Sequence, residues 1–364
     1  MNIVEKIKQI NRDVKTVTRP IRDVIAKFIL DKKQRSAKKI DFGKAKTVLF
    51  LRDDNKIGDM VVSTILFREI KKKYPKIKII VLSGKDSKEI IKYNPYVDEI
   101  VETTGKFLKD LIVYFKLRKY CIDIIVDTLS FTPRPLYLLK LRIINPYFLI
   151  GYDKQRYNVY DHSIKSDKYS HITKKYGMLL NYFDINEYSL DYDIFFGGMT
   201  YKNISWDYEN SSGKILINPF GASTHRTLSP AKLQELVDKI KAGMKLCNIF
   251  ILCQNHNYDH VKNIAGAKIL KVATPLETAY IISKSDCVVT PDTSVVHISR
   301  VFDKKMVVMS LDYSNNDEKV NQIWAPLYDK AVQVFVDTKN DTIGNDIENI
   351  NIDFVADSVL KINS

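Results

Sequence analysis

One stretch late in the chain runs Asp286-Cys287-Val288-Val289-Thr290-Pro291-Asp292-Thr293-Ser294-Val295-Val296-His297. Its apolar first half is typical of a short buried strand that ends in a turn, and residues 298–302 continue as a helix. A strand followed by small hydroxyl residues and a helix start often binds anions. The free backbone N–H groups and the positive end of the helix dipole point to one spot there. Asp292 or Thr293 could equally cap the helix, so both interpretations stay open.

A second segment near the start of the chain has the same plan. An apolar strand runs from Val48 to Arg52, a polar loop follows, and Gly58-Asp59 opens a helix that ends near Tyr74-Pro75. The apolar residues of this helix recur at three- and four-residue spacing. Gly58 permits a tight turn. Asp59 is expected at a helix start beyond a strand end, which is where open α/β sheets bind ligands. An N-cap role for Asp59 is the alternative.

A third loop follows the strand-like residues 215–220. It runs Gly221-Ala222-Ser223-Thr224-His225-Arg226-Thr227-Leu228-Ser229-Pro230. The hydroxyls of Ser223 and Thr224 can donate to phosphate oxygens, and Arg226 is a planar, permanently charged donor suited to a pyrophosphate. Ser229-Pro230 is a typical helix cap and first helical residue. The loop therefore predicts a phosphate site, with an ordinary polar loop as the alternative.

Strand and helix patterns alternate in two separate series. Strands are expected at 46–52, 78–83, 98–102, 122–127, 147–151, 214–218, 247–253, 268–271, 286–290, 306–310 and 332–336. Helices are expected at 59–73, 86–92, 106–119, 132–141, 170–183, 230–242, 257–265, 275–284, 293–302 and 353–361. Alternation of this kind predicts two doubly wound, Rossmann-like α/β domains that face each other across a cleft. The expected parts are an extension at 1–45, domains at 46–200 and 201–345, and a C-terminal helix at 346–364.

The composition of the 364 residues is that of a soluble globular protein, with 45% hydrophobic and 27% charged residues. Cys121, Cys247, Cys253 and Cys287 lie in apolar segments without zinc-ligand spacing, which predicts reduced, buried thiols. The charged N-terminus predicts no signal peptide, and no apolar run is long enough for a transmembrane helix, so a cytoplasmic location is expected. The missing GxGxxG and GxxxxGK[ST] motifs argue against a dinucleotide oxidoreductase and a P-loop NTPase.

The net charge of +14 is concentrated at the N-terminus, where residues 1–40 hold 12 Lys and Arg against four Asp and Glu. Apolar residues fall on one face of a predicted helix there, with basic residues beside them: Val17, Ile21, Val24, Ile25, Phe28 and Ile29, then Arg19, Arg22, Lys27, Lys32 and Lys33. Such a segment could bind the surface of the inner membrane or dock on the body of the protein. Nucleic-acid binding is not expected, because a recognition motif is missing.

Four motifs in this order resemble glycosyltransferase family 9, the ADP-heptose:lipopolysaccharide heptosyltransferases. They are Ile57-Gly58-Asp59-Met60-Val61, Asn94-Pro95-Tyr96-Val97-Asp98-Glu99-Ile100, the Gly-Ala-Ser-x-x-Arg loop at 221–226, and Asp292-Thr293-Ser294-Val295-Val296-His297. The resemblance extends over residues 46–310. It implies a GT-B fold whose N-terminal domain binds the acceptor and whose C-terminal domain binds the nucleotide-sugar.

The resemblance also implies an inverting sugar transfer without a metal cofactor, from ADP-heptose to a lipopolysaccharide-type core acceptor. Asp59 matches the family's proposed general base, and Arg226 matches the basic residue that faces the donor pyrophosphate. The other expected donor contacts are Ser223, Thr224, Gln254, Asp292, Thr293, Ser294 and His297. Ser294 replaces the usual glycine. Gln254 lies where many members have an acidic residue near the ribose, which leaves the nucleotide open.

The residue types suit this chemistry. A carboxylate can take the proton of an acceptor hydroxyl as that hydroxyl attacks the anomeric carbon. Because no Asp-x-Asp metal site is evident in a suitable loop, the leaving diphosphate would be stabilised by Arg226, hydroxyl groups and helix N-termini. Two alternatives remain. One is a GT-B nucleotide-sugar enzyme with another sugar or an epimerase-like reaction. The other is a non-catalytic glycan- or nucleotide-binding protein.

Overall fold

A computed structural model describes residues 23–25, 27–33, 40–129, 132–167, 169–198, 213–311, 320–336 and 346–364. The chain divides into two compact units. Unit 1 comprises Met1–Asp54, Lys71–Lys85 and Val97–Ser166, and unit 2 comprises Asn55–Ile70, Asp86–Tyr96 and Asp167–Ser364. Each unit contains one parallel sheet, and the two sheets are those that the alternating pattern predicts.

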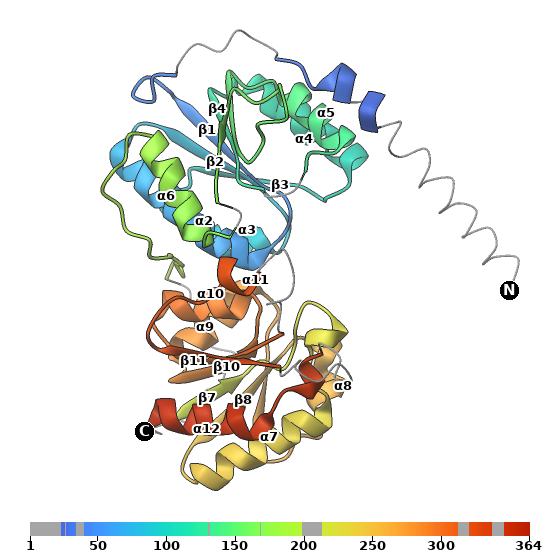
Figure 1. Cartoon of the computed structure of the whole chain (residues 1–364), viewed down its shortest axis with the longest axis vertical. Helices are drawn as coiled ribbons and strands as arrows, with labels where there is room; N and C mark the ends of the chain where they lie inside the picture. The colour runs from blue at the N-terminus through green and yellow to red at the C-terminus, as the bar shows by residue number, and fades with distance from the viewer. Residues whose placement is uncertain are drawn as a thin grey trace, which may run out of the picture. The chain divides into compact units, whose positions relative to one another are not determined.

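Unit 1 is built on a six-stranded parallel sheet with the order β3-β2-β1-β4-β5-β6. The strands are β1 (Thr47–Arg52), β2 (Lys78–Ser83), β3 (Glu99–Glu102), β4 (Ile124–Asp127), β5 (Phe148–Tyr152) and β6 (His162–Ile164). Two helices of this unit, α4 (Phe107–Lys119) and α5 (Pro135–Ile144), pack against each other (Figure 1). The first five strands agree with the predicted ranges to within a few residues. The short edge strand β6 was not predicted.

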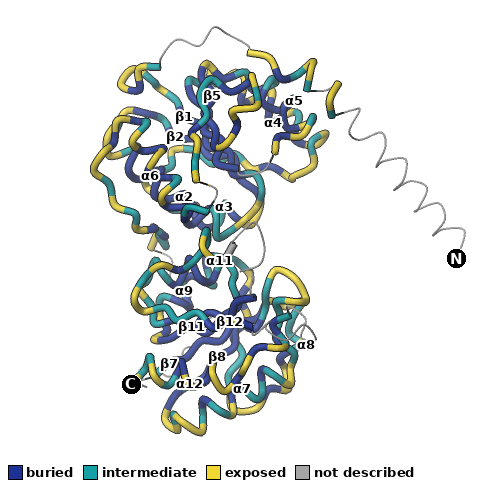
Figure 2. Tube along the Cα trace, in the orientation of Figure 1, coloured by how far each residue is buried: buried dark blue, intermediate teal, exposed yellow. Residues whose placement is uncertain are grey.

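The core of unit 1 forms where α4 and α5 cover one face of this sheet. Leu49, Leu51 and Ile125 of the central strands belong to the same buried cluster as Leu117 of α4 and Leu141 of α5. The central strands are buried along their whole length, as the dark tube in Figure 2 shows. Burial on both faces explains why these strands are continuously apolar instead of alternating.

Unit 2 is built on a second six-stranded parallel sheet with the order β12-β11-β10-β7-β8-β9. The strands are β7 (Lys214–Ile217), β8 (Asn248–Cys253), β9 (Lys268–Lys271), β10 (Cys287–Pro291), β11 (Lys305–Ser310) and β12 (Ala331–Phe335). The helices of the second half are α7 (Pro230–Gly243), α8 (Tyr258–Val261), α9 (Pro275–Lys284), α10 (Ser294–Val301), α11 (Val320–Ile323) and α12 (Ile352–Asn363). Most of α2 (Ile57–Lys73), together with α3 (Ser87–Ile91) and α6 (Ile172–Tyr182), also belongs to unit 2.

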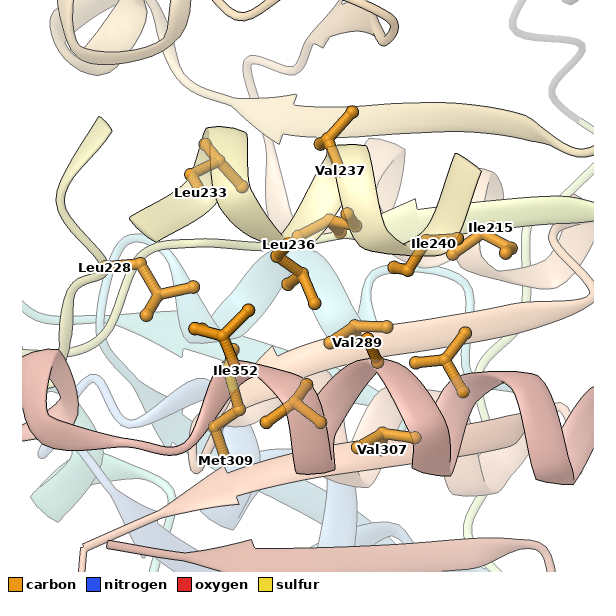
Figure 3. Close-up of a cluster of buried hydrophobic side chains, with 14 of the residues drawn as sticks. Ile215, Leu228, Leu233, Leu236, Val237, Ile240, Val289, Val307, Met309 and Ile352 are labelled. Carbon is orange, nitrogen blue, oxygen red and sulfur yellow. The ribbon is translucent and has the colours of Figure 1, made fainter. Parts of the chain in front are cut away.

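The core of unit 2 lies where α7 and α12 cover one face of its sheet. Figure 3 shows Leu236 and Ile240 of α7 near Ile352 of α12, with Val289 and Val307 of the central strands beside them. All five side chains are at most 2% exposed. The predicted helix at 257–265 is shorter than expected, because a 3₁₀ turn over Asn255–Asn257 precedes the single turn of α8.

Helix α2 is anchored in unit 2 by a buried arginine. Arg68 Nε donates to Glu69 Oε1 at 2.6 Å, and Arg68 NH1 donates to Asp193 Oδ2 at 2.5 Å. The guanidinium also donates to the carbonyl oxygens of Ser189 and Asp191. These contacts fix the helix that carries Gly58 and Asp59 in its first turn.

The prediction that all four cysteine thiols are buried is wrong for one of them. Cys121 is exposed at the end of α4, whereas Cys247, Cys253 and Cys287 are buried as predicted. The chain turns through a positive φ of 50° at Cys121, which places the thiol outside the strand that follows. Within the described ranges, no helix combines the length and the apolar character needed to cross a membrane.

The basic N-terminal segment is described in part, and residues 1–22 lie outside the described residues. Residues 23–33 dock on unit 1: Leu30 packs against its core, and the buried Asp31 accepts a hydrogen bond from the Val159 amide at 2.8 Å. Arg142 of α5 donates to the carbonyl oxygens of Leu30 and Lys32. Leu30 to Lys32 therefore contact the body of the protein, whereas Ile25 and Phe28, which the docking interpretation would bury, are exposed. The apolar side chains of Val24 and Ile29 are exposed too, so these four residues do not take part in this docking. The expected membrane contact stays a prediction.

Candidate functional site

A cavity of about 570 Å³ opens in unit 2 at the carboxyl ends of β7, β8, β9 and β10. The start of α2 lines it too, and all of the lining residues belong to unit 2. They are Lys56 to Asp59, Asn218, Phe220 to Ala222, Arg226, Leu252 to Gln254, His256, Asn257, Val272, Pro275, Thr278, Asp292 to Val295, His297, Ile298 and Trp324. The crevice outside the carboxyl ends of parallel strands is the usual ligand site of open α/β sheets.

The turn between β10 and α10 is held in shape by polar side chains. Asn218, at the end of β7, donates through Nδ2 to Thr290 Oγ1 at 3.0 Å. Thr293 caps α10, since its Oγ1 accepts from the Val295 amide at 3.3 Å. Asp292 does not cap the helix. It is half-buried in the cavity wall, where burial raises its pKa and the nearby Arg226 opposes that rise. The cap and the ligand site thus coincide in one turn.

His297 lies one turn into α10 and is 5% exposed. Tyr192 and Trp324 approach its ring edge-on, with ring centroids 6.1 Å and 5.7 Å away. Burial lowers the pKa of His297 to about 4, although the charge of Asp59 acts in the opposite direction. The imidazole is therefore neutral near pH 7. Its Nδ1 is buried and has no hydrogen-bond partner among the described residues.

The first turn of α2 approaches His297 closely. A Cβ added to Gly58 would lie 2.9 Å from His297 Cδ2 and 3.4 Å from Ser294 Cα, so only glycine allows the two helix starts to come this near. Asp59 follows, with a side chain that is 14% exposed and an Oδ2 that lies 3.9 Å from Lys56 Nζ. Because α2 begins at Ile57, Asp59 lies inside its first turn and is not the N-cap residue. The N-cap alternative is therefore wrong.

The loop after β7 closes tightly on itself. A Cβ added to Gly221 would lie 2.3 Å from the Arg226 carbonyl oxygen, and the Gly221 amide donates to Thr227 Oγ1 at 3.1 Å. The loop brings Arg226 into the cavity wall. Ser223 and Thr224 belong to the same loop, but they are exposed and do not line the cavity.

Most of the expected donor residues come together in the cavity, which is lined by Arg226, Gln254, Asp292, Thr293, Ser294 and His297. Lys56, Asn218, Phe220, Thr278 and Trp324 also line it and were not predicted. Lys56, Asn218 and Phe220 could have been found, because they lie directly beside a predicted motif, whereas Thr278 lies inside α9 away from any of them. Trp324 had no such signal, since it follows a short helix outside the regular alternation. Among the described residues, no three side chains of the metal-binding types cluster together.

Comparisons with known proteins agree with this geometry. No family model matches the chain. A curated protein of Escherichia coli (strain K12), provisionally named lipopolysaccharide heptosyltransferase 4, is 24% identical over 304 residues, which are 81% of this chain and 82% of that protein.

Solved structures are similar to the chain over nearly its whole length. A glycosyl transferase family 9 structure from Veillonella parvula DSM 2008 has a TM-score of 0.68, with 11% identity, 87% of this chain and 97% of that chain covered. The E. coli heptosyltransferase WaaC, solved with ADP, has a TM-score of 0.65 and 12% identity. The match covers 87% of this chain and 100% of that chain. The E. coli ADP-heptose lipopolysaccharide heptosyltransferase II has a TM-score of 0.63, with 12% identity and 87% and 98% covered.

Two parallel six-stranded sheets with flanking helices, and a cavity at the strand ends of the second, match the GT-B fold of these structures. The curated relative adds sequence similarity to this structural match. The chain is thus similar in sequence to a curated heptosyltransferase and in fold to structures of glycosyltransferase family 9, the family that the four motifs resemble.

Proposed function

We propose that this protein is an inverting heptosyltransferase that moves a heptose from ADP-heptose to a lipopolysaccharide-type core acceptor. The observation that carries the proposal is one cavity that contains a carboxylate at a helix start, Asp59, and a cation, Arg226, beside the first turn of α10. Its relatives are named for heptosyl transfer to lipopolysaccharide. The cavity of about 570 Å³ has the size of a typical small-molecule site.

On the donor side, the diphosphate of the nucleotide-sugar would bind between Arg226 and the start of α10. The free N–H groups of that first turn and the positive end of the helix dipole favour an anion. Arg226 supplies charge-assisted hydrogen bonds to phosphate oxygens. Gln254, at the end of β8, would contact the ribose through neutral hydrogen bonds, since its carboxamide replaces a carboxylate.

On the acceptor side, Asp59 would act as the general base. The acceptor oxygen attacks the anomeric carbon on the face opposite the diphosphate, and the bond between that carbon and the diphosphate oxygen breaks. The acceptor proton passes to Asp59, and the new glycosidic bond has inverted configuration. The neutral His297, which lines the cavity, would hydrogen-bond the sugar or the acceptor hydroxyl and hold it in line.

Charge on the leaving diphosphate would be stabilised without a metal ion. Arg226 and Lys56 are cations in the cavity wall, and preorganised charges of this kind stabilise a developing anion. The reaction would take place in the cytoplasm at the inner face of the membrane, where residues 1–40 would contact the lipid surface. Their net charge of +8 favours an anionic bilayer.

Transfer assays with the purified full-length protein test this function. The protein is incubated with a delipidated core acceptor and, in turn, ADP-heptose and UDP-, GDP- and CMP-sugars, with and without EDTA. We expect a heptosylated product from ADP-heptose alone, at the same rate in EDTA, with the opposite anomeric configuration by NMR. Transfer from another nucleotide-sugar would support the alternative GT-B enzyme. Donor binding without turnover would support the non-catalytic alternative.

A further inference from the structure

The strongest unexplained feature outside the cavity is the outer face of α4. Leu108, Ile112 and Phe115 are 80%, 80% and 53% exposed. Their spacing of four and three residues places them on one stripe of the helix. The opposite face of α4 buries Tyr114 and Leu117 in the core of unit 1. Helix α4 is therefore apolar on two faces, and only one of them is covered by the protein.

Other exposed apolar side chains cluster around α5, the neighbour of α4. Arg118 of α4 donates to the Ile143 carbonyl of α5, and Arg142 of α5 holds residues 30–32. The docked N-terminal segment exposes Val24, Ile25, Phe28 and Ile29, and the start of α5 exposes Leu136. Together with the α4 stripe these make eight of the 14 large apolar side chains that are exposed in the described residues. Such concentration marks an interaction surface.

The charges beside this surface are almost all positive. Lys109 and Lys116 lie next to the α4 stripe, and Lys106 and Lys119 lie at the two ends of the helix; all four are exposed. The single acidic residue of α4, Asp110, is buried, and its Oδ1 accepts from the amide and the hydroxyl of Thr104. The outer side of α4 thus combines apolar residues with cations and shows no exposed carboxylate.

We propose that the outer face of α4, together with residues 23–33, is the surface by which this protein docks on an anionic lipid bilayer. Apolar side chains enter the boundary between headgroups and acyl chains, and flanking lysines contact anionic headgroups. A second copy fits less well, because α4 against α4 would oppose lysines to lysines. The proposal rests on the proposed function only in that a lipid-linked acceptor would place the enzyme at this surface.

Vesicle sedimentation with the full-length protein tests the surface. The variant replaces two exposed residues, Leu108→Ser and Ile112→Ser. The control variant replaces two exposed apolar residues of unit 2, Leu246→Ser and Phe354→Ser. With phosphatidylethanolamine–phosphatidylglycerol vesicles, we expect the α4 variant to bind about tenfold more weakly than the wild type, or weaker still. The control variant should bind as the wild type does. Added salt and pure phosphatidylcholine vesicles should weaken binding by the wild type.

A fluorescent label identifies the face that meets lipid. In a Cys121→Ser background, which removes the exposed native thiol, Ile112→Cys is labelled with an environment-sensitive dye. Vesicles should shift its emission to the blue, whereas a dye at Leu246→Cys should not respond. Wild-type binding by the α4 variant, or an unshifted dye at position 112, would overturn the proposal. A blue shift that occurs without vesicles and grows with protein concentration would also overturn the proposal, because a second copy of the protein would then cover the face. Transfer to the delipidated acceptor is measured in parallel, so that a failure of the proposed function is seen separately.

Discussion

Asp59 is the residue on which the proposed reaction depends. It lies in the first turn of α2 and lines the same cavity as Arg226. We predict that Asp59→Asn lowers kcat by about 10²–10⁴-fold, since an amide cannot accept the acceptor proton. The side chain keeps its shape, so donor affinity by calorimetry and the thermal midpoint should stay close to wild type. A rate within a factor of about three of wild type would remove the base assignment.

Arg226 acts through charge in the proposed mechanism. Arg226→Ala should weaken binding of ADP-heptose by about 1.5–3 kcal/mol, the usual contribution of a hydrogen bond to a charged group. Arg226→Lys should recover only part of this affinity, because a lysine cannot form the planar, bidentate contact. Isothermal titration gives both values. Equal affinities for all three proteins would show that Arg226 is solvated in the bound state.

His297 links the site to pH. Its pKa of about 4 lies below the unfolded value of about 6.5, so the unfolded chain takes up the proton first as pH falls. The stability associated with neutral His297 is therefore complete above pH 6.5 and is lost as pH falls toward 4, by about 3 kcal/mol at most. Urea unfolding between pH 7 and about 4 should show a smaller loss for His297→Gln than for the wild type. His171 and Arg300, which also lower this pKa, stay in place in both proteins. An equal loss of stability between pH 7 and about 4 in the wild type and in His297→Gln would contradict the prediction.

At the scale of elements, most of the fold could be predicted because burial leaves a clear pattern. Continuous apolar runs marked the central strands, and Ser229-Pro230 marked the start of α7, where Ser229 Oγ accepts from the Lys232 amide. The short strand β6 could not be predicted, since three residues at a sheet edge carry little pattern. The exposure of Cys121 depends on a left-handed turn that the local sequence does not specify.

The candidate site was predictable where it follows strand ends and less so elsewhere. Asp59, Arg226 and His297 stood in motifs with a physical meaning, and all three line one cavity. Ser223 and Thr224 were expected there because hydroxyls bind phosphate, but the closure of the loop at Gly221 leaves them exposed. A motif gives residue types in order, whereas side-chain direction depends on how the loop closes in three dimensions.

Helix α2 depends on Arg68 for its position. The guanidinium contacts two carboxylates and two carbonyl oxygens, and it is 5% exposed. Arg68→Met should lower the free energy of the transition in which unit 2 unfolds by about 3–5 kcal/mol, because Glu69 and Asp193 would lose the cation that pairs them. Chemical denaturation measures the loss. Because Asp59 lies in the first turn of the same helix, kcat should fall more than donor affinity. As a control, Lys71→Met replaces a half-buried lysine whose partner Asp98 stays near solvent, and it should change stability by about 1 kcal/mol or less.

At the scale of the whole molecule, the chain contains two separate hydrophobic cores. One gathers around β1 and β4 with α4 and α5, and the other lies around β7 and β10 with α7 and α12. Each core includes residues of one unit, with its own parallel sheet. Two cores of this kind need not unfold together, so a single two-state unfolding free energy is not expected for this chain.

The cavity belongs to unit 2 alone, which gives a prediction about ligand-linked stability. Scanning calorimetry of the wild type should resolve two transitions, of which ADP-heptose raises one. The stabilisation follows mass action and reaches about 2.7 kcal/mol at a donor concentration 100 times Kd. In Arg226→Ala, the same donor concentration should raise the transition temperature by less, because Kd is larger. Without donor, both transitions should occur at the same temperatures as in the wild type. An equal shift of both transitions would mean that the two cores unfold as one cooperative structure. A shift confined to the other transition would show that the donor binds to unit 1, and the cavity could then not be the donor site.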